Sequence, residues 1–192
     1  MKLYIRNMVC NRCVAVVKSE LEKAKLHPLT VTMGQVELQE DLNLNELNAL
    51  NKQLKVHGFE LIDDKRNKIL EQIKNIIIEQ IHYTGEKRKV KYSELLAKQL
   101  GKDYSALSNL FSEMEGITIE QYIILQKTEK VKELLIYDEL NLSQIADVLD
   151  YSSVAHLSAQ FKKVTGLTPS QFKSLKENRR NPLDNVHSTK II

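Results

Sequence analysis

Both cysteines of the chain lie in the short stretch NMVCNRC, residues 7–13, directly after an apolar run. Two thiolates on one loop can hold a soft metal ion, because sulfur ligands favour Cu(I) and Zn(II) over magnesium or calcium. Two ligands are too few for a closed tetrahedral zinc site, but they suffice for an ion of low coordination number. The spacing of Cys10 and Cys13 therefore favours a Cu(I) site, which Ag(I) or Hg(II) would fit similarly.

The same two thiols allow two other interpretations. A thioredoxin-type redox pair has this spacing, but it usually carries Gly-Pro between the cysteines, where this chain has Asn-Arg. Two inert buried thiols are the second alternative, although the pair lies on a polar loop. If a helix begins at Cys13, its dipole lowers the thiol pKa, and we expect a thiolate to form readily there.

A second stretch with a functional pattern is SQIADVLDYSSVAHLSAQFKK, residues 143–163. It predicts one helix, a turn over residues 150–152 and a second helix that begins after an N-cap at Ser153. This is the pattern of a helix-turn-helix unit, whose second helix enters the DNA major groove. Lys162 and Lys163 stand at the end of that helix, where they would meet phosphates.

The same pattern occurs earlier in the chain. Residues 92–111 (YSELLAKQLGKDYSALSNLF) align with residues 142–161, with a one-residue slip at Leu107 and Leu157. A long helix over about 119–137 joins the two copies. An ordinary helical hairpin would not be duplicated in this way, so the two units predict binding to double-stranded DNA.

The elements that carry these sites fall into two regions. Residues 1–64 give the order β-α-β-β-α-β, with a hairpin turn at Gly34 and a helix stop at Gly58, which is the split βαβ arrangement called ferredoxin-like. After them the strand signals vanish, and Asp63 or Asp64 can cap the next helix. The predicted fold class is α+β. It comprises a ferredoxin-like domain over 1–64, an all-α domain with two helix-turn-helix units over 65–180, and a disordered tail over 181–192.

Charge and composition narrow the function classes. The net charge is +3, and residues 162–192 carry 7 basic against 2 acidic residues, which suits a polyanionic partner. No apolar run approaches the roughly 18 residues that span a membrane, and no signal-peptide core follows Met1. We therefore expect a cytoplasmic protein with no membrane partner. The sequence has no nucleophile–base constellation and no phosphate loop, which predicts that it is not an enzyme.

The N-terminal region resembles the heavy-metal-associated domain of copper chaperones and copper-pumping ATPases. That family carries M-x-C-x-x-C after its first strand, and Met8, Cys10 and Cys13 match it. The resemblance implies that Cys10 and Cys13 are the metal ligands and that Met8 packs under the loop without ligating. His57 departs from the family. It could supply a third ligand and admit Zn(II) or Ni(II), or it could be a solvated or capping residue.

Residues 68–177 resemble the DNA-binding domain of AraC-type transcription regulators. The stretch FKKVTGLTPSQFK carries the signature F-K-K-x-T-G-x-T-P-S-x-F/Y-K/R nearly complete, although Asp150 stands where the turn usually has Gly. The resemblance implies that both recognition helices enter successive major grooves. The residues it places at the DNA are Ser105, Ser108 and Asn109 in the first unit, and Val154, Ala155, Ser158 and Ala159 in the second. The N-cap Ser153 is also expected at the DNA.

Family members often have Arg at the positions of Asn109 and Ala159, and this chain has none there. Because Arg to guanine is the commonest strong base contact, the second unit is expected to read few bases through hydrogen bonds. It would instead touch thymine methyl groups or hold phosphates. His156 could reach the backbone or a base, or it could be plain surface.

Together the two regions indicate a metal-responsive transcription regulator, with Cu(I) as the first candidate and Ag(I), Hg(II) or Zn(II) as others. The short connection DDKRN, residues 63–67, makes a stiff joint that could pass a change from one region to the other. The resemblance implies activation of metal export or detoxification genes, and with it contact with RNA polymerase. A regulator that senses thiol oxidation and a copper-delivering metallochaperone remain as alternatives.

Overall fold

The computed structural model describes residues 1–84 and 91–174. The chain divides into two compact units, the first over Met1–Asn75 and the second beginning at Ile76. This division falls inside a helix, eleven residues beyond residue 64. The domain boundary at residue 64 therefore stays a prediction. The predicted tail over 181–192 lies outside the described residues.

The first unit is a small sheet with helices. Four antiparallel strands lie in the order β2-β3-β1-β4, and the chain passes through them as β-α-β-β-α-β. The central strand is paired on both sides, with Leu3 opposite Val36 and Ile5 opposite Leu61. The bounds are β1 (Lys2–Arg6), α1 (Asn11–Lys23), β2 (Pro28–Thr32), β3 (Gln35–Leu38), α2 (Leu44–Val56) and β4 (Glu60–Ile62).

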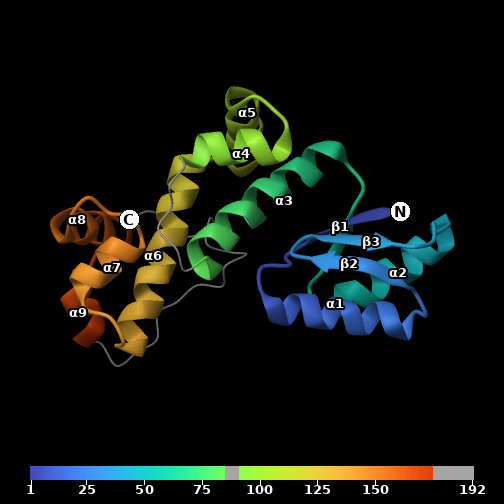
Figure 1. The fold of residues 1–192 in the computed structure, drawn as a ribbon, viewed down its shortest axis with the longest axis horizontal. Helices are drawn as coiled ribbons and strands as arrows, with labels where there is room; N and C mark the ends of the chain where they lie inside the picture. Colours follow the sequence, from blue (N-terminus) through green and yellow to red (C-terminus); the bar gives the residue numbers. More distant parts are fainter. Residues whose placement is uncertain (85–90, 175–192) are drawn as a thin grey trace. The chain divides into compact units, whose positions relative to one another are not determined.

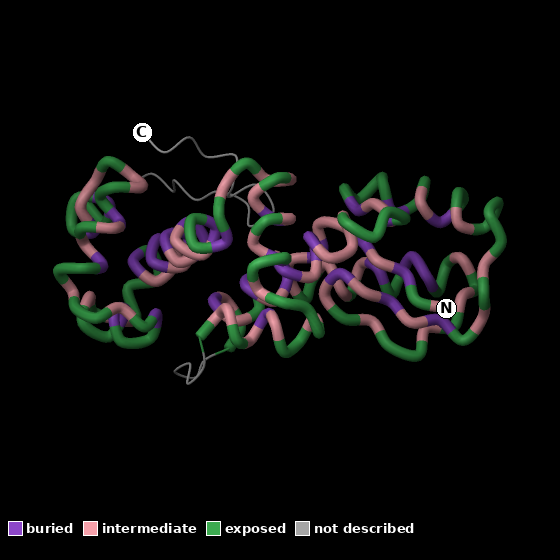
Figure 2. Tube along the Cα trace, turned by 90° about the horizontal axis from the view of Figure 1, so that it is seen from above, coloured by how far each residue is buried: buried purple, intermediate pink, exposed green. Residues whose placement is uncertain are grey.

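One face of this sheet forms the core of the unit. Leu3 and Ile5 alternate with outward-facing residues along β1, as the period of two along a strand requires. They share an apolar cluster with Val17 of α1 and Leu50 of α2. Both helices therefore lie on the same face of the sheet (Figure 1), and Figure 2 marks the buried residues of the unit in purple.

The other face of β1 is met by the first turns of α3 (Lys65–Ile78). Asp64 caps this helix by accepting a hydrogen bond from the Asn67 N–H at 3.0 Å, which confirms one of the two predicted caps. Arg6 donates to the Asn67 amide oxygen at 3.1 Å, and its Nε lies 3.6 Å from the Glu71 carboxylate. The ammonium of Lys68 lies 5.4 Å above the ring of Tyr4. The start of α3 is thus fastened to the strand that leads to the cysteines.

A second fastening lies at the turn between β2 and β3. Gly34 has φ +75°, and its carbonyl accepts a hydrogen bond from the Ile5 N–H at 3.0 Å. A Cβ atom at this position would lie 2.0 Å from Nδ2 of Asn75, a buried residue of α3. Only glycine lets the turn and the helix approach so closely.

The second unit is all helical over its described residues. A π-helical turn, η1 (Glu79–Tyr83), continues α3. The long helix α6 is buried along most of its length and contacts α5, α8 and α9. The bounds of the helices that follow η1 are α4 (Tyr92–Leu100), α5 (Tyr104–Glu115), α6 (Ile119–Tyr137), α7 (Leu142–Val148), α8 (Val154–Thr165) and α9 (Pro169–Ser174). The protein therefore combines a four-stranded sheet with an all-helical region, as the α+β prediction required.

Candidate functional sites: a thiol pair and a nucleic-acid interface

The two cysteines meet at the start of α1. Cys10 is the N-cap, and its sulfur accepts a hydrogen bond from the Cys13 N–H at 3.4 Å. The two Sγ atoms lie 3.1 Å apart, in hydrogen-bond contact and well beyond the roughly 2.05 Å of a disulfide. Both cysteines are free and half-buried. The geometry is that of a reduced, converging thiol pair on the surface of the sheet unit.

The predicted lowering of the thiol pKa at this helix start is wrong for Cys13. Burial raises the pKa of the Cys13 thiol, and the hydrogen bond with Cys10 raises it further. Backbone hydrogen bonds at Val9 and Cys10 act in the opposite direction but do not prevail. Because a thiol must lose its proton to become a metal ligand, ion binding at Cys13 would release a proton at neutral pH.

Met8 and His57 have different places around this pair. Met8 is completely buried in the core below the loop, so it lies where the resemblance placed it. The His57 imidazole lies 3.2 Å from the carboxylate of Glu20, about two helical turns beyond Cys13 along α1. Among the described residues no three His, Cys, Asp or Glu side chains gather as a metal cluster. The structure therefore does not bring His57 to the thiols as a third ligand, since Glu20 holds its ring.

The second unit contains the two predicted helix-turn-helix units, α4 with α5 and α7 with α8. In α5 the buried side chains are Leu107 and Phe111, and in α8 they are Leu157 and Phe161, fifty residues later. The pattern of buried, half-buried and exposed residues is the same over residues 104–111 and 154–161. The predicted N-cap Ser153 is confirmed, and its hydroxyl accepts a hydrogen bond from the backbone N–H of residue 156 at 3.1 Å.

The duplication extends past the recognition helices. Thr118 caps α6 and pairs with Gln121, as Thr168 pairs with Gln171 at the start of α9. The ring of Phe111 lies 5.4 Å from that of Tyr122, and the ring of Phe161 lies 5.6 Å from that of Phe172. Each copy is therefore a set of three helices closed by one aromatic pair, and the third helix of the first copy is the start of α6.

The one-residue slip between the copies lies in the turn. Gly101 and Asp150 occupy equivalent left-handed positions, with φ +60° and +56°. They are 49 residues apart, whereas the caps Asp103 and Ser153 that follow are 50 residues apart. The second turn thus carries one extra residue. Asp150 adopts the conformation for which most sequences use glycine, and Asp tolerates it better than most side chains do.

The DNA-facing residues implied by the resemblance lie on one side of each recognition helix. Ser108, Val154 and Ser158 are half-buried, and the others are exposed. The Ser105 hydroxyl donates to the carboxylate of the N-cap Asp103, so it is already engaged. Asp103 was not among the predicted residues, although an Asp before a helix is a recognised N-cap. The exposed members are Ser105, Asn109, Ser153, Ala155, His156, Ala159, Lys162 and Lys163.

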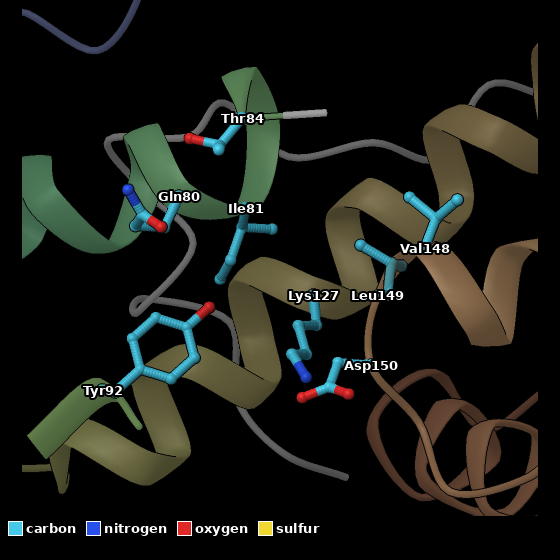
Figure 3. Close-up of a pocket in the computed structure, with 8 residues that line it drawn as sticks. All are labelled: Gln80, Ile81, Thr84, Tyr92, Lys127, Val148, Leu149 and Asp150. Carbon is cyan, nitrogen blue, oxygen red and sulfur yellow. The ribbon is translucent and has the colours of Figure 1, made fainter. Parts of the chain in front are cut away.

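The turn between α7 and α8, in the second helix-turn-helix unit, is held against α6. The ammonium of Lys127 lies 5.0 Å above the ring of Tyr151. Beside it is a pocket of about 30 Å³, room for about one water molecule, into which the Tyr92, Lys127 and Asp150 side chains point (Figure 3). Burial, together with the nearby Tyr92 phenol, raises the pKa of Tyr151, so its hydroxyl keeps its proton. The turn is therefore held by α6 through Lys127, and it shares this pocket with residues of α4 and η1.

Residues 96–174 match the family model described as a helix-turn-helix domain. The matched segment runs from within α4 to the end of α9 and includes both α5 and α8. The chain is 27% identical over 136 residues to an uncharacterized HTH-type transcriptional regulator of Staphylococcus aureus, which covers 69% of this chain and 17% of that protein. It is 29% identical over 101 residues to the xylose operon regulatory protein of Escherichia coli K12, covering 52% of this chain and 26% of that one. The chain thus spans a minor part of these relatives.

Among solved structures, the chain is similar to the C-terminal domain of AraT, a response regulator from Geobacillus stearothermophilus. The match has 23% identity and a TM-score of 0.48, and it covers 62% of this chain and 95% of that domain. The matching family model and the curated relatives are helix-turn-helix regulators rather than enzymes, as the sequence predicts. Within the described residues, no helix has the length and apolar character needed to cross a bilayer.

Proposed function

We propose that the chain is an AraC-type transcription regulator that binds double-stranded DNA through α5 and α8. The observation that carries this proposal is the duplication, in which caps, buried residues and aromatic pairs recur fifty residues apart. The N-terminal turns of such helices meet base edges, and the side chains at their ends meet phosphates. Activation of its target genes, contact with RNA polymerase and a cytoplasmic location belong to the same proposal.

The phosphate role of α8 has a direct test. Lys162→Ala/Lys163→Ala protein is expected to bind random-sequence duplex DNA less tightly, and its log affinity should fall less steeply with log salt, by a slope difference of about 1.8. The measurement is fluorescence anisotropy over a salt series. Lys18→Ala/Lys52→Ala protein, which loses two exposed lysines of the sheet unit, should keep the wild-type slope. An unchanged slope in the α8 variant would remove these lysines from the interface.

The sheet unit supplies the sensor in this proposal. Its strand order and its two helices on one face support a ferredoxin-like, heavy-metal-associated domain. Two thiols whose sulfurs lie 3.1 Å apart fit a soft ion of low coordination number after a small opening of the pair. Cu(I) is the first candidate, with Ag(I) or Hg(II) as substitutes. Zn(II) would need ligands from outside this pair, because His57 is bound to Glu20.

The bound ion would act on α3 through β1. The cysteines follow β1, and β1 is fastened to α3 through Arg6, Tyr4 and the Gly34 turn. We expect Cu(I) to change the DNA affinity by shifting this packing, and DNA must then change the Cu(I) affinity by the same factor. The coupling is measured as the ratio of DNA dissociation constants with and without Cu(I).

Gly34→Ala tests this path. The added methyl group would strike Asn75 and force a left-handed alanine, which costs more than about 1 kcal/mol of folding free energy. We expect Cu(I) binding and copper-free DNA binding to persist while the effect of Cu(I) on DNA affinity shrinks severalfold. Gly58→Ala is the matched control, because its φ of +80° brings the same strain but its Cβ meets no atom within 4 Å. Equal coupling in wild type and Gly34→Ala would rule out this contact as the path.

A thiol-redox sensor is the second candidate, and the close approach of the two sulfurs favours it. Atoms 3.1 Å apart need to move only about 1 Å to form a disulfide. Peroxide would then replace the ion as the signal. DNA binding that responds to peroxide, in a protein that holds no Cu(I), would support this candidate over the metal sensor. A metallochaperone is the weaker alternative, because delivery of copper leaves the helix-turn-helix domain without a role.

A further inference from the structure

His156 stands on the exposed side of α8 with its ring held in place. Its Nδ1 lies 3.0 Å from the hydroxyl of Ser152, and its ring meets that of Tyr151 edge to face at 5.4 Å and 84°. Tyr151 is itself fixed, because its hydroxyl donates to Gln160 at 2.8 Å and Lys127 lies over its ring. The imidazole thus has one fixed orientation, unlike a freely rotating surface histidine.

The contact with Ser152 holds the ring whichever of the two atoms donates the hydrogen bond. When the hydroxyl donates to Nδ1, the neutral ring carries its proton on Nε2 and presents a single N–H donor there. Of the exposed residues in the first two turns of α8, Ala155 and Ala159 have no hydrogen-bonding group in their side chains. His156 is therefore the exposed hydrogen-bonding side chain in the part of α8 that meets base edges.

We propose that His156 reads a guanine in the major groove, with Nε2–H donating to N7 or O6. Guanine presents two adjacent acceptors at this edge, whereas adenine sets an amino donor beside its N7 and thymine sets a methyl group beside its O4. Cytosine presents a donor, which an N–H cannot use. Ser152 and Tyr151 act as positioning residues. This inference rests on the proposed binding of α8 to DNA, and it gives the second unit a base contact despite its lack of Arg.

The test is selection of bound duplexes from a random-sequence library by the full chain, followed by sequencing. Wild type should enrich a site with one guanine that His156→Ala protein no longer prefers. The preference at that position should fall about 2- to 12-fold, the worth of one neutral hydrogen bond, while the other positions keep theirs. Ser152→Ala should weaken the preference at the same position, because the ring is then free to turn. His27→Ala, which removes an exposed imidazole from the sheet unit, should change no position.

The other outcomes separate this inference from the proposed function. Uniformly weaker binding by His156→Ala, with an unchanged site, would mean a phosphate contact and overturn base reading. Unchanged affinity and site would make His156 plain surface and overturn it as well. If wild type enriches no site at all, the proposed sequence-specific DNA binding fails, whatever His156 does.

Discussion

Cys10→Ser/Cys13→Ser protein is expected to lose the one tightly held Cu(I) ion that each wild-type chain should bind. The two sulfurs converge at the start of α1, and the described part of the chain offers no third ligand beside them. Hydroxyl groups are hard, poorly ionised ligands, so serine cannot replace a thiolate for a soft ion. The measurement is an anaerobic competition titration of reduced protein against a chromophoric Cu(I) chelator.

Two controls make this result specific. Met8→Leu protein should keep the ion, because Met8 is completely buried and leucine has a similar volume. The double cysteine variant should also keep the wild-type circular dichroism and copper-free DNA affinity, since both cysteines are only half-buried. A variant that holds Cu(I) as tightly as wild type would place the ion elsewhere and remove the thiol pair from the sensor.

Phe161→Ala is expected to cost about 3–5 kcal/mol of the free energy of unfolding of the helical unit. The ring is buried, with 1% exposed, and stands edge to face against Phe172 between α8 and α9. Its loss leaves a cavity that the short helix α9 cannot fill. Urea unfolding followed by circular dichroism measures the change, and DNA binding should fall because α8 loses its support.

Phe111→Ala is the matched variant in the first copy, where the ring packs against Tyr122. We expect a loss of the same size, since Phe111 is equally buried. Both variants should retain Cu(I) binding, because the thiols lie in the other compact unit. A loss below about 1 kcal/mol for Phe161→Ala would show that the second copy is not built around this aromatic pair.

Much of this arrangement follows from local sequence rules. The cap at Ser153 and the i, i+4 pair Leu157 and Phe161 determine α8, because a capping hydroxyl and one apolar stripe suffice for a short helix. The sequence shows that the two copies differ by a one-residue slip, but it does not show where in the copies the slip lies. A one-residue insertion in a turn leaves no periodic signal, so only the equivalent φ angles of Gly101 and Asp150 locate it.

The details that the sequence did not predict, the pKa of Cys13 and the partner of His57, depend on the folded structure around them. The helix dipole would lower the pKa of Cys13, but burial and the hydrogen bond with Cys10 outweigh it. The resemblance places His57 close to the thiol loop, but in the structure its ring lies beside the buried carboxylate of Glu20. Such choices between competing partners depend on tertiary distances, which spacing along the chain does not contain.

The length of α6 has a further consequence. Its 19 residues span about 28 Å, and its first turns belong to one copy while α8 and α9 pack farther along it. A helix advances about 1.5 Å and turns about 100° with each residue. Inserting one residue in α6 would therefore rotate one helix-turn-helix unit by about 100° relative to the other, about the axis of α6. Only steps of about seven residues, two turns, nearly restore the angle. A change in the length of α6 that keeps the relative orientation of the two helix-turn-helix units therefore moves them apart or together by about 10 Å.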